Sequence, residues 1–481
     1  MPPVRGEDTP PFPIYPWSMK HIRVIGGGLA GPEAALQAAS RNCRVTLYEM
    51  RPQRSTEAHQ TSDFAELVCS NSLKSESENS APWLLKHEMR AAGSFLLADA
   101  DATAVPAGHA LAVDRAAFSE RVRERLEAHP NITICREEVT TLDPADAHLT
   151  ILASGPLTSP SLTQALQQIT GANQLAFYDS ISPIVDASTI NMEKVYFAAR
   201  WDKGTADYIN CPFTKVEYDD FIDALSTAEK VEPKAWEQIP GELPTADFGP
   251  EKPLQYFEGC LPIEETARRG RDTLRFGPMK PAGLTNPKTG RWPYAAVQLR
   301  CENLRADSYN LVGFQNHLKF GEQARILRMI PGLEYATFLR YGQIHRNTYI
   351  HSPSLLTETL QLRARPDVLI AGQLSGVEGY TESIASGMLA GIFAAAIAHG
   401  ETPVPAPRTT AHGSLIHYIT HSETKNFQPA NITFDLLPPL DEELRKRIRD
   451  KKERHRIQCE RAMEAWHAWH AWLPSQVPVG V

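Results

Sequence analysis

The alternation of apolar and polar residues near the N-terminal end predicts a strand, a helix and a second strand in succession. Residues 21–25 (HIRVI) form a short run rich in β-branched residues, as in a buried strand. Residues 29–40 carry apolar side chains at the spacing of a helix that packs on a sheet, and residues 44–48 (RVTLY) predict the next strand. Parallel sheets are built from such units, so this pattern predicts an α/β domain.

Three glycines occupy the turn between the first predicted strand and the helix, in the order Gly26-x-Gly28-x-x-Gly31. In this pattern the first glycine permits a tight turn, the second lets the backbone approach a pyrophosphate, and the third lets the helix pack closely on the strand. An acid at the end of the second strand binds ribose hydroxyls. The pattern predicts a dinucleotide site, for FAD or NAD, made by Gly26, Gly27, Gly28, Leu29, Ala30, Gly31, Glu49 and Arg51.

A second strand-to-helix turn is predicted far along the chain. Residues 367–372 (DVLIAG) read as a strand, Gln373 follows, and a helix is predicted from about residue 381 to 399. Backbone N–H groups at such a turn meet the flavin side of the cofactor in FAD enzymes, so Gly372, Gln373 and Gly376 favour FAD over NAD.

The pattern between these two turns changes at about residue 183. Helices are predicted at 83–97 and 113–129, and strands at 132–135 and 149–155, whereas residues 183–319 are rich in proline and aromatic residues, with one clear helix entry at 211–225. We therefore predict a Rossmann-type α/β domain (19–185 and 331–405) interrupted by an inserted α+β substrate domain (186–330). A flexible tail (1–18, with Met19 as an alternative start) and a C-terminal segment (406–481) with a charged helix at 441–472 complete the chain.

Composition narrows the class of protein. The 481 residues are 42% hydrophobic and 22% charged, as in a soluble enzyme, and the net charge of −8 argues against indiscriminate nucleic-acid binding. We see no apolar run of the ~18 residues that a membrane span needs and no secretory signal in residues 1–18. The seven cysteines are scattered without a CxxC pair, so the sequence predicts no metal site. It predicts free thiols, as in a protein of the reducing cytoplasm.

Several unusual sequence motifs resemble those of a known protein family. The glycine loop is followed in order by EMRP, AHQT, ELVCSNS, EGCLPIEE, RRGRDTLRFGPMKP, YNLVGFQ, HRNTY and AGQLSGVEGYTES. Over residues 20–391 the chain thereby resembles the TrmFO family of tRNA uracil-5-methyltransferases, which implies a GidA-like fold. The resemblance implies methylation of C5 of the T-loop uridine 54 of tRNA, with FAD as cofactor and 5,10-methylenetetrahydrofolate and NAD(P)H as co-substrates. The alternatives are an MnmG-like (GidA) enzyme that modifies wobble uridines, a small-molecule FAD oxidoreductase, and a flavin-bearing RNA-binding protein without turnover.

The resemblance also implies catalytic and binding roles for residues whose types alone would suggest only structural roles. A lone cysteine is usually a small buried hydrophobe, but here Cys260 is expected to add to C6 of uracil, and Cys69 to act beside the flavin as base, alternative nucleophile or shield. His345 and Tyr380 are candidates for stacking on the pterin, and Glu378 and Glu382 are guesses for the base. A basic run is usually a solvated face, yet next to Cys260 we expect tRNA contacts from Arg268, Arg269, Arg271, Arg275 and Lys280. The oligomeric state stays open, a monomer included.

Overall fold

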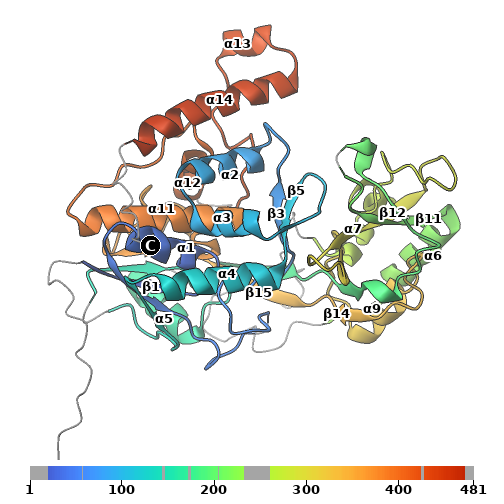
Figure 1. Ribbon diagram of the computed structural model, residues 1–481, viewed down its shortest axis with the longest axis horizontal. Helices are drawn as coiled ribbons and strands as arrows, with labels where there is room; N and C mark the ends of the chain where they lie inside the picture. Colours follow the sequence, from blue (N-terminus) through green and yellow to red (C-terminus); the bar gives the residue numbers. More distant parts are fainter. Residues whose placement is uncertain are drawn as a thin grey trace, which may run out of the picture.

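The computed structural model describes residues 20–56, 58–143, 147–171, 175–203, 205–231, 261–423 and 427–471, and for residues 175–180 and 344–346 it describes the backbone alone. These residues form two lobes that stand side by side, each with its own sheet and its own buried apolar cluster (Figure 1). The chain passes from the first lobe into the second and returns to the first.

Within the described residues, five parallel strands make the sheet of the first lobe, in the order β16-β7-β1-β2-β6. All five residues of β1 are buried, because strands lie on both of its sides and helices cover its faces. This arrangement confirms the predicted α/β class. The strands are β1 (His21–Ile25), β2 (Arg44–Tyr48), β6 (Ile132–Cys135), β7 (Leu149–Leu152) and β16 (Val368–Ile370).

Two helices from opposite ends of the sequence pack against each other beside this sheet. They are α1 (Ala30–Ala39) and α11 (Tyr380–Ala398). Glycines permit the close approach: a Cβ at Gly387 would lie 2.3 Å from the carbonyl oxygen of Ala30, and one at Gly391 would lie 2.4 Å from that of Ala34. In the described part of the chain, α11 alone is long and apolar enough to cross a membrane, but 89% of its apolar stretch is buried inside the protein. It is a core helix.

The inserted lobe is built on an antiparallel sheet with helices packed against it. Among the described residues six strands pair in the order β10-β11-β12-β13-β9-β14. Phe213, Phe221 and Phe314 pack within its apolar cluster. The elements are β9 (Ile184–Asp186), β10 (Tyr196–Phe197), β11 (Ile209–Phe213), α6 (Lys215–Ser226), α7 (Ile263–Arg268), α8 (Thr273–Phe276), β12 (Ala295–Cys301), β13 (Ser308–Leu311), α9 (Phe320–Leu327) and β14 (Phe338–Arg340).

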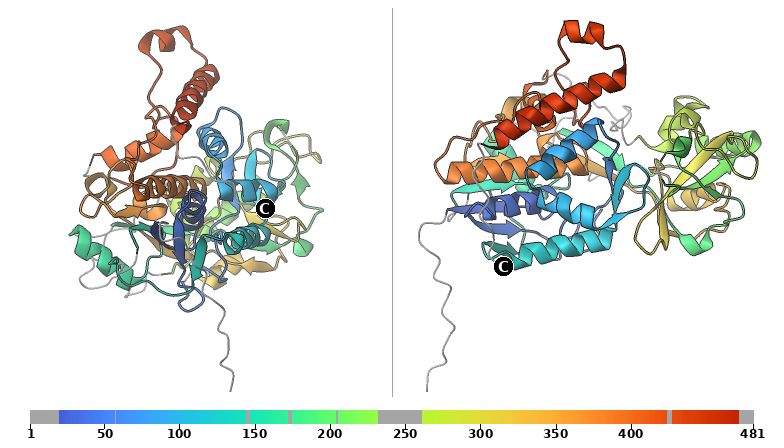
Figure 2. Two further views of the ribbon diagram at one scale, coloured as in Figure 1. Left: turned by 60° about the vertical axis from the view of Figure 1, so that its left-hand side comes forward. Right: turned by 45° about the horizontal axis from the view of Figure 1, so that its top comes forward.

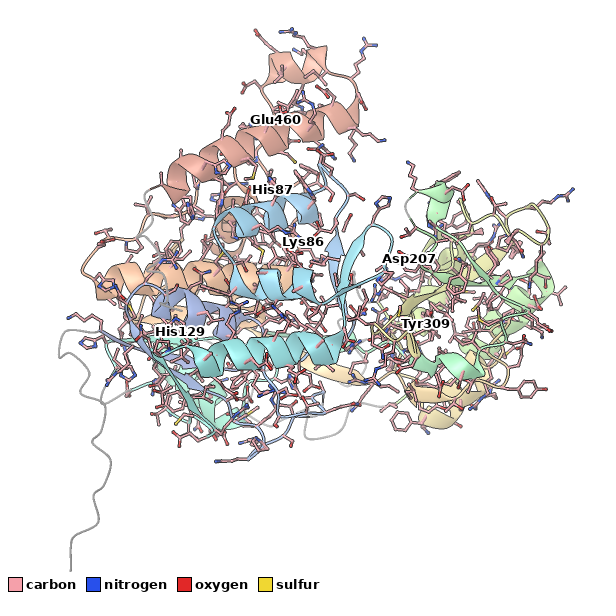
Figure 3. All side chains as sticks on the ribbon, in the orientation of Figure 1. Lys86, His87, His129, Asp207, Tyr309 and Glu460 are labelled. Carbon is pink, nitrogen blue, oxygen red and sulfur yellow. The ribbon has the colours of Figure 1, made fainter. Side chains whose placement is uncertain are left out.

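Paired strands and side-chain contacts join the lobes. The chain leaves the first lobe through β8 (Leu175–Ser180) and returns through β15 (Ile344–Tyr349), which pair antiparallel along their full length. A second contact lies at the start of β11, where the Asp207 carboxylate accepts a hydrogen bond of 2.8 Å from the Gly108 amide. Figure 3 shows Asp207 on the side of the inserted lobe that faces the small sheet of β3 (Ser72–Ser75), β4 (Ala104–Val105) and β5 (Ala110–Val113).

Two predicted helices are broken where a cap residue intervenes. The helix predicted at 83–97 is α2 (Ala81–Ala91) followed by α3 (Phe95–Ala102), because Gly93 adopts a positive φ of 74° and the Ser94 side chain caps α3. The charged helix predicted at 441–472 is α13 (Glu442–Arg447) followed by α14 (Lys451–His470), since Asp450 caps the second helix. Both views of Figure 2 show α13 standing away from the body of the protein.

The C-terminal segment is docked on the first lobe by a buried acid. Glu88 accepts hydrogen bonds from the amides of Ala411 (2.7 Å) and His412 (3.0 Å) at the start of α12, and His412 stacks on Trp466 of α14 with ring centroids 4.4 Å apart. A carboxylate is well placed there, because it meets the positive end of a helix. The remaining helices are α4 (Arg115–Ala128), α5 (Pro160–Thr170), α10 (Ser352–Leu355) and α12 (Ala411–His421).

Candidate functional site

A cavity opens at the carboxyl ends of the parallel strands, where the predicted cofactor residues meet. Its wall contains Gly26, Gly27, Gly28, Leu29 and Ala30 from the first turn. Gly372 and Gln373 from the second turn, together with Cys69 and Tyr380, also line it, as do Glu49, Arg51 and Glu378. Ligands of open α/β sheets bind at this end of the strands, so the cavity is where a dinucleotide is expected.

The three glycines of the first turn have different surroundings. Gly26 has a φ of 116°, and a Cβ there would lie 2.3 Å from the carbonyl oxygen of Ala153. A Cβ at Gly31 would lie 1.8 Å from the carbonyl oxygen of Gly26, so this glycine serves the packing of α1 and stands behind the wall. A Cβ at Gly28 would meet nothing within 4 Å. The turn is therefore rigid at two glycines and open toward the cavity at the third.

Glu49 is fixed in the wall as a carboxylate. It is buried, and it accepts hydrogen bonds from the Gly27 amide (2.8 Å), the Arg51 amide (2.9 Å) and Arg51 Nε (2.9 Å). Burial alone would raise the pKa of Glu49, but the charge and hydrogen bonds of Arg51, with the Gly27 amide, outweigh it and hold the pKa below its ordinary value. Arg51 also binds the Glu66 carboxylate and thereby anchors the following loop.

The second turn contributes only part of its expected residues to the wall. Gly372 adopts a φ of 72°, its amide donates to Ser386 Oγ at 2.9 Å, and Gln373 donates to the Glu378 carboxylate at 2.5 Å. Gly376 is turned away, because a Cβ there would lie 2.5 Å from the ring of Phe427. Gly376 thus supports the turn from behind.

Cys69 lies in the cavity wall on a loop that other elements hold by its backbone. The Tyr380 hydroxyl accepts hydrogen bonds from the amides of Cys69 (2.7 Å) and Ser70 (3.3 Å). Burial, and after it the neighbouring Cys69, raise the pKa of Tyr380 well above its ordinary value, so the ring stays a neutral phenol. Tyr380 is thereby a support for the Cys69 loop; whether it also stacks on a pterin stays a prediction.

Two arginines hold the carbonyl groups just before Cys69. Arg115 donates to the Leu67 carbonyl at 2.6 Å, and Arg340 donates to the carbonyls of Val68 (3.0 Å) and Ala58 (3.1 Å). Because they come from α4 and from β14 of the inserted lobe, the loop is clamped from both lobes and sits beside two positive charges. Sequence analysis missed both arginines, and nothing in their local sequence distinguishes them.

Asn71 ties the same loop directly to the inserted lobe. It is completely buried, it donates to the Cys301 carbonyl at 2.9 Å, and its own side-chain oxygen accepts from Arg300 Nε at 2.9 Å. A buried amide with satisfied donor and acceptor fixes the geometry of both partners. The position of Cys69 therefore depends on how the lobes are joined. The signal for Asn71 was its place in the word ELVCSNS.

Two of the site residues expected from the sequence are outside what can be described in atomic detail. Cys260 falls outside the described residues, and for His345 the backbone alone is described, in β15 opposite Asp179. The start of α7, shortly after Cys260, is nevertheless near the cavity. The amide of Ile263 donates to the carbonyl of Gln315 at 2.9 Å, and Gln315 lines the cavity.

The two glutamates considered as bases have different surroundings. Glu378 lies in the cavity wall, whereas Glu382 is buried, with Oε1 2.6 Å from Lys74 Nζ and 3.0 Å from the Ile432 amide. A carboxylate held in this way supports the fold. Glu378 is therefore the better placed of the two for proton transfer in the cavity.

Two of the arginines expected to contact tRNA are paired with acids of their own lobe. Arg268 Nε donates to Glu265 at 2.8 Å, and Arg271 contacts the carboxylates of Asp219 (3.2 Å) and Asp223 (2.5 Å). These pairs lower the positive charge that the run RRGR offers to phosphate. Sequence reasoning did not foresee them, because the two aspartates lie on α6.

The other three basic candidates are arranged differently. Arg275 lies over the ring of Tyr294, 4.1 Å from its centroid, and Arg269 and Lys280 are exposed on the surface. Lys280 has no ion pair among the described residues. The basic surface that residues 268–280 offer is therefore smaller than the sequence suggests.

One group of side chains could hold a metal ion although none was predicted. Ligating atoms of Glu358, His417 and His421 lie within 4.8 Å of one another, away from the cavity wall described above. No ion is present. Thr420 Oγ1 lies 2.9 Å from His421 Nδ1, and the charge of Arg408 interacts with both Glu358 and His417. A neighbouring cation and a competing hydroxyl weaken the case for a metal there.

Comparison with known proteins gives one family and consistent relatives. The family model described as Glucose inhibited division protein A matches residues 21–402. The chain is 65% identical over 443 residues to the methylenetetrahydrofolate-tRNA-(uracil-5-)-methyltransferase TrmFO of Koribacter versatilis, over 92% of this chain and 96% of that one. It is 52% identical over 445 residues to the protein of the same name from Enterococcus faecalis, over 92% and 97%. Aquifex aeolicus GidA, in its form I crystal, superposes with a TM-score of 0.67 over 95% of this chain and 77% of that one, at 16% identity, which supports the fold.

Proposed function

The chain belongs to the family of glucose inhibited division protein A and, within it, to the TrmFO methyltransferases, and from this membership we propose that it methylates C5 of uridine 54 in tRNA. The carbon comes from 5,10-methylenetetrahydrofolate. Bound FAD, in its reduced form, supplies the hydride equivalent that turns a methylene into a methyl group, and NAD(P)H restores that form. The reaction takes place in the cytoplasm and needs no S-adenosylmethionine.

The cavity fits the FAD that this chemistry needs. Gly28 leaves open space on the cavity side of the turn, so a pyrophosphate can approach the backbone there. The N-terminus of α1 points at the same place with its unpaired amides and positive dipole end. Glu49 is ionised and can accept hydrogen bonds from ribose hydroxyls. These groups would hold the adenosine half, with Gly372 and Gln373 on the flavin side.

Methylation at C5 requires activation of the uracil by a nucleophile. C5 is a poor nucleophile in the free base, because its electron density is delocalised into the enone. When a thiolate bonds to C6, the ring becomes an enolate whose C5 attacks an electrophilic CH₂ that is still bonded to the nitrogen of its carrier. Loss of the C5 proton expels that nitrogen as an amine and leaves an exocyclic methylene. A hydride added to the methylene carbon makes the methyl group, and departure of the thiolate from C6 restores the ring. We assign this addition to Cys260, since a thiol is partly ionised near neutral pH and intrinsically nucleophilic.

The observation that supports the proposal most directly is the placement of Cys69. A second thiol lies in the wall of the same cavity as the glycine turn, and its amide is bound by Tyr380 at the start of α11. Hydride transfer from a small amine to a flavin needs no nucleophilic thiol, so a thiol held at this place favours methyl transfer over amine oxidation. Cys69 can remove the C5 proton or shield the reacting carbon, while Glu378 is the other candidate base in the wall.

The proposal is tested by methyl transfer into an unmodified tRNA transcript, with methylenetetrahydrofolate and NADPH supplied. We expect Cys260→Ala and Cys69→Ala each to lower the rate by at least about 100-fold while flavin stays bound. Cys135→Ala is the matched control, because Cys135 is likewise only partly buried but, at the end of β6, is not one of the residues that line the cavity. Full activity of Cys260→Ala would move the nucleophile elsewhere. Failure of the unaltered protein to methylate tRNA would refute the function itself.

A further inference from the structure

Two tryptophans lie side by side on the surface of the inserted lobe. Trp201 follows β10 and is 55% exposed, and Trp292 precedes β12 and is 50% exposed. Their ring centroids are 5.2 Å apart and the ring planes meet at 86°. Tryptophan carries the largest apolar surface of any side chain, so two of them half-exposed at one place are unusual for a surface that stays in water.

The backbone at Trp201 is held in a conformation that bulky residues avoid. Its φ of 63° and ψ of 26° are left-handed, and Asp202 follows with a φ of 51°. The Trp201 amide donates to the Gly283 carbonyl at 2.7 Å, and a Cβ at Gly283 would lie 2.7 Å from the Trp201 ring, so this glycine makes room for it. Such a conformation persists only where the surroundings enforce it, and it is typical of ligand-binding positions.

A neighbouring arginine supplies part of that enforcement. Arg200 donates to the carbonyls of Lys280 (3.0 Å) and Ala282 (2.5 Å) and to Gln298 Oε1 (2.9 Å). These three bonds tie the segment of Trp201 to the turn before Leu284 and to β12. The ring is therefore presented to solvent by a rigid base, and ordering it on binding costs little entropy.

Three exposed basic residues adjoin the tryptophans in the chain or are tied to their segment, and one exposed acid, Asp202, lies among them. Lys203, Lys280 and Arg291 are exposed, and within the described part of the chain none of the three has an ion-pair partner. Lys203 lies two residues beyond Trp201, Arg291 adjoins Trp292, and the backbone of Lys280 is held by Arg200. Surfaces that bind single-stranded nucleic acid combine exposed aromatic rings with unpaired basic side chains, as this one does.

We propose that Trp201 and Trp292 form a nucleobase-stacking site for unpaired nucleotides of the tRNA, with Lys203, Lys280 and Arg291 contacting the adjoining phosphates. This rests on the proposed function, because it assigns a contact to the substrate of the same reaction. The rings stack on any base, so the site holds and orients the tRNA without reading its sequence. It lies on the lobe that also contributes Arg340 to the clamp on Cys69, so binding there brings the substrate to the lobe that helps to build the cavity.

Binding of an unmodified tRNA transcript to the full-length flavoprotein, measured by filter binding at several salt concentrations, tests the site. We expect Trp201→Ala and Trp292→Ala each to weaken binding about 5- to 100-fold, with an unchanged slope of log Kd against log salt, because no charge is removed. Lys280→Ala and Arg291→Ala should instead lower that slope by about one each. Tyr335→Ala is the control, since Tyr335 is a 90% exposed aromatic of the same lobe outside the tryptophan pair.

The results distinguish failure of the stacking site from failure of the proposed function. Trp201→Gly accepts the left-handed backbone, so it should fold and keep its flavin while still losing tRNA affinity. If the tryptophan variants bind tRNA as tightly as the unaltered protein, the stacking site is refuted and the proposed function stands. If the unaltered protein binds no tRNA, the proposed function fails as well. If the tryptophan variants change the mass measured by light scattering, the pair is a contact between two copies of this chain, and the proposal is wrong.

Discussion

Replacing Gly28 by alanine tests whether this glycine is needed for FAD binding rather than for folding. An added methyl group would meet no heavy atom within 4 Å, so the folded apoprotein can accommodate it. The smaller conformational freedom of alanine in the unfolded chain should even stabilise the apoprotein, by about 0.4–1 kcal/mol. The same methyl group would occupy the place where a phosphate meets the backbone. Loss of one charge-assisted hydrogen bond costs about 1.5–3 kcal/mol, which weakens FAD binding about 10- to 150-fold.

The measurements are flavin absorbance per protein after gel filtration, titration of the apoprotein with FAD, and thermal unfolding of the apoprotein. Gly31→Ala is the contrasting variant, because its methyl group would lie 1.8 Å from the carbonyl oxygen of Gly26. It should lower the stability of the apoprotein itself. If Gly28→Ala retains FAD as tightly as the unaltered protein, the pyrophosphate does not lie at this turn, and the reasoning fails.

Three further predictions concern charged side chains. Lys86 is completely buried and donates to three backbone carbonyls around β3, so Lys86→Met should lower the free energy of unfolding in urea by about 2–4 kcal/mol; an unchanged value would contradict this. Arg340→Met releases the carbonyls before Cys69, and we expect kcat for methyl transfer to fall about tenfold at constant flavin content, whereas loss of flavin would point to a different role. Because the pKa of Glu49 is depressed in the folded protein, its contribution to stability is present above the ordinary value of 4.5 and is lost as the pH falls through the depressed pKa. Glu49→Gln should therefore flatten the loss of stability in acid, and an unaltered acid limb would exclude this contribution.

The parts of the site that are local in sequence could be predicted from sequence. Gly26, Gly28 and Glu49 were expected at one place from their spacing between one strand, one helix and the next strand, and they line one cavity, with Gly31 packed behind it. The turn at Gly372 was predicted for the same reason. Gly376 followed the same pattern but packs on Phe427, which no local pattern foretells.

The contacts that position Cys69 could not be predicted, because they join distant parts of the chain. Arg340 and Asn71 reach across the two lobes, and Tyr380 binds the Cys69 loop from a position 311 residues further along the chain. Side chains of this kind have no periodicity, and most of their partners are backbone groups, which no residue type marks in the sequence. The same holds for Trp201, whose backbone angle depends on the distant Gly283.

The pairing of α1 with α11 has a consequence for how the protein is made. The turn after β1, which forms one wall of the cavity, leaves the ribosome early. The opposite wall lies between β16 and α11 and is made much later. Behind that wall, Val377 pairs with Ala430, which is made later still. A growing chain therefore carries the nucleotide fingerprint during most of its synthesis without a place to retain the nucleotide. A fragment truncated before α11 would keep every glycine of the motif but lack the second wall, so we expect cofactor to be captured only after that helix has been made.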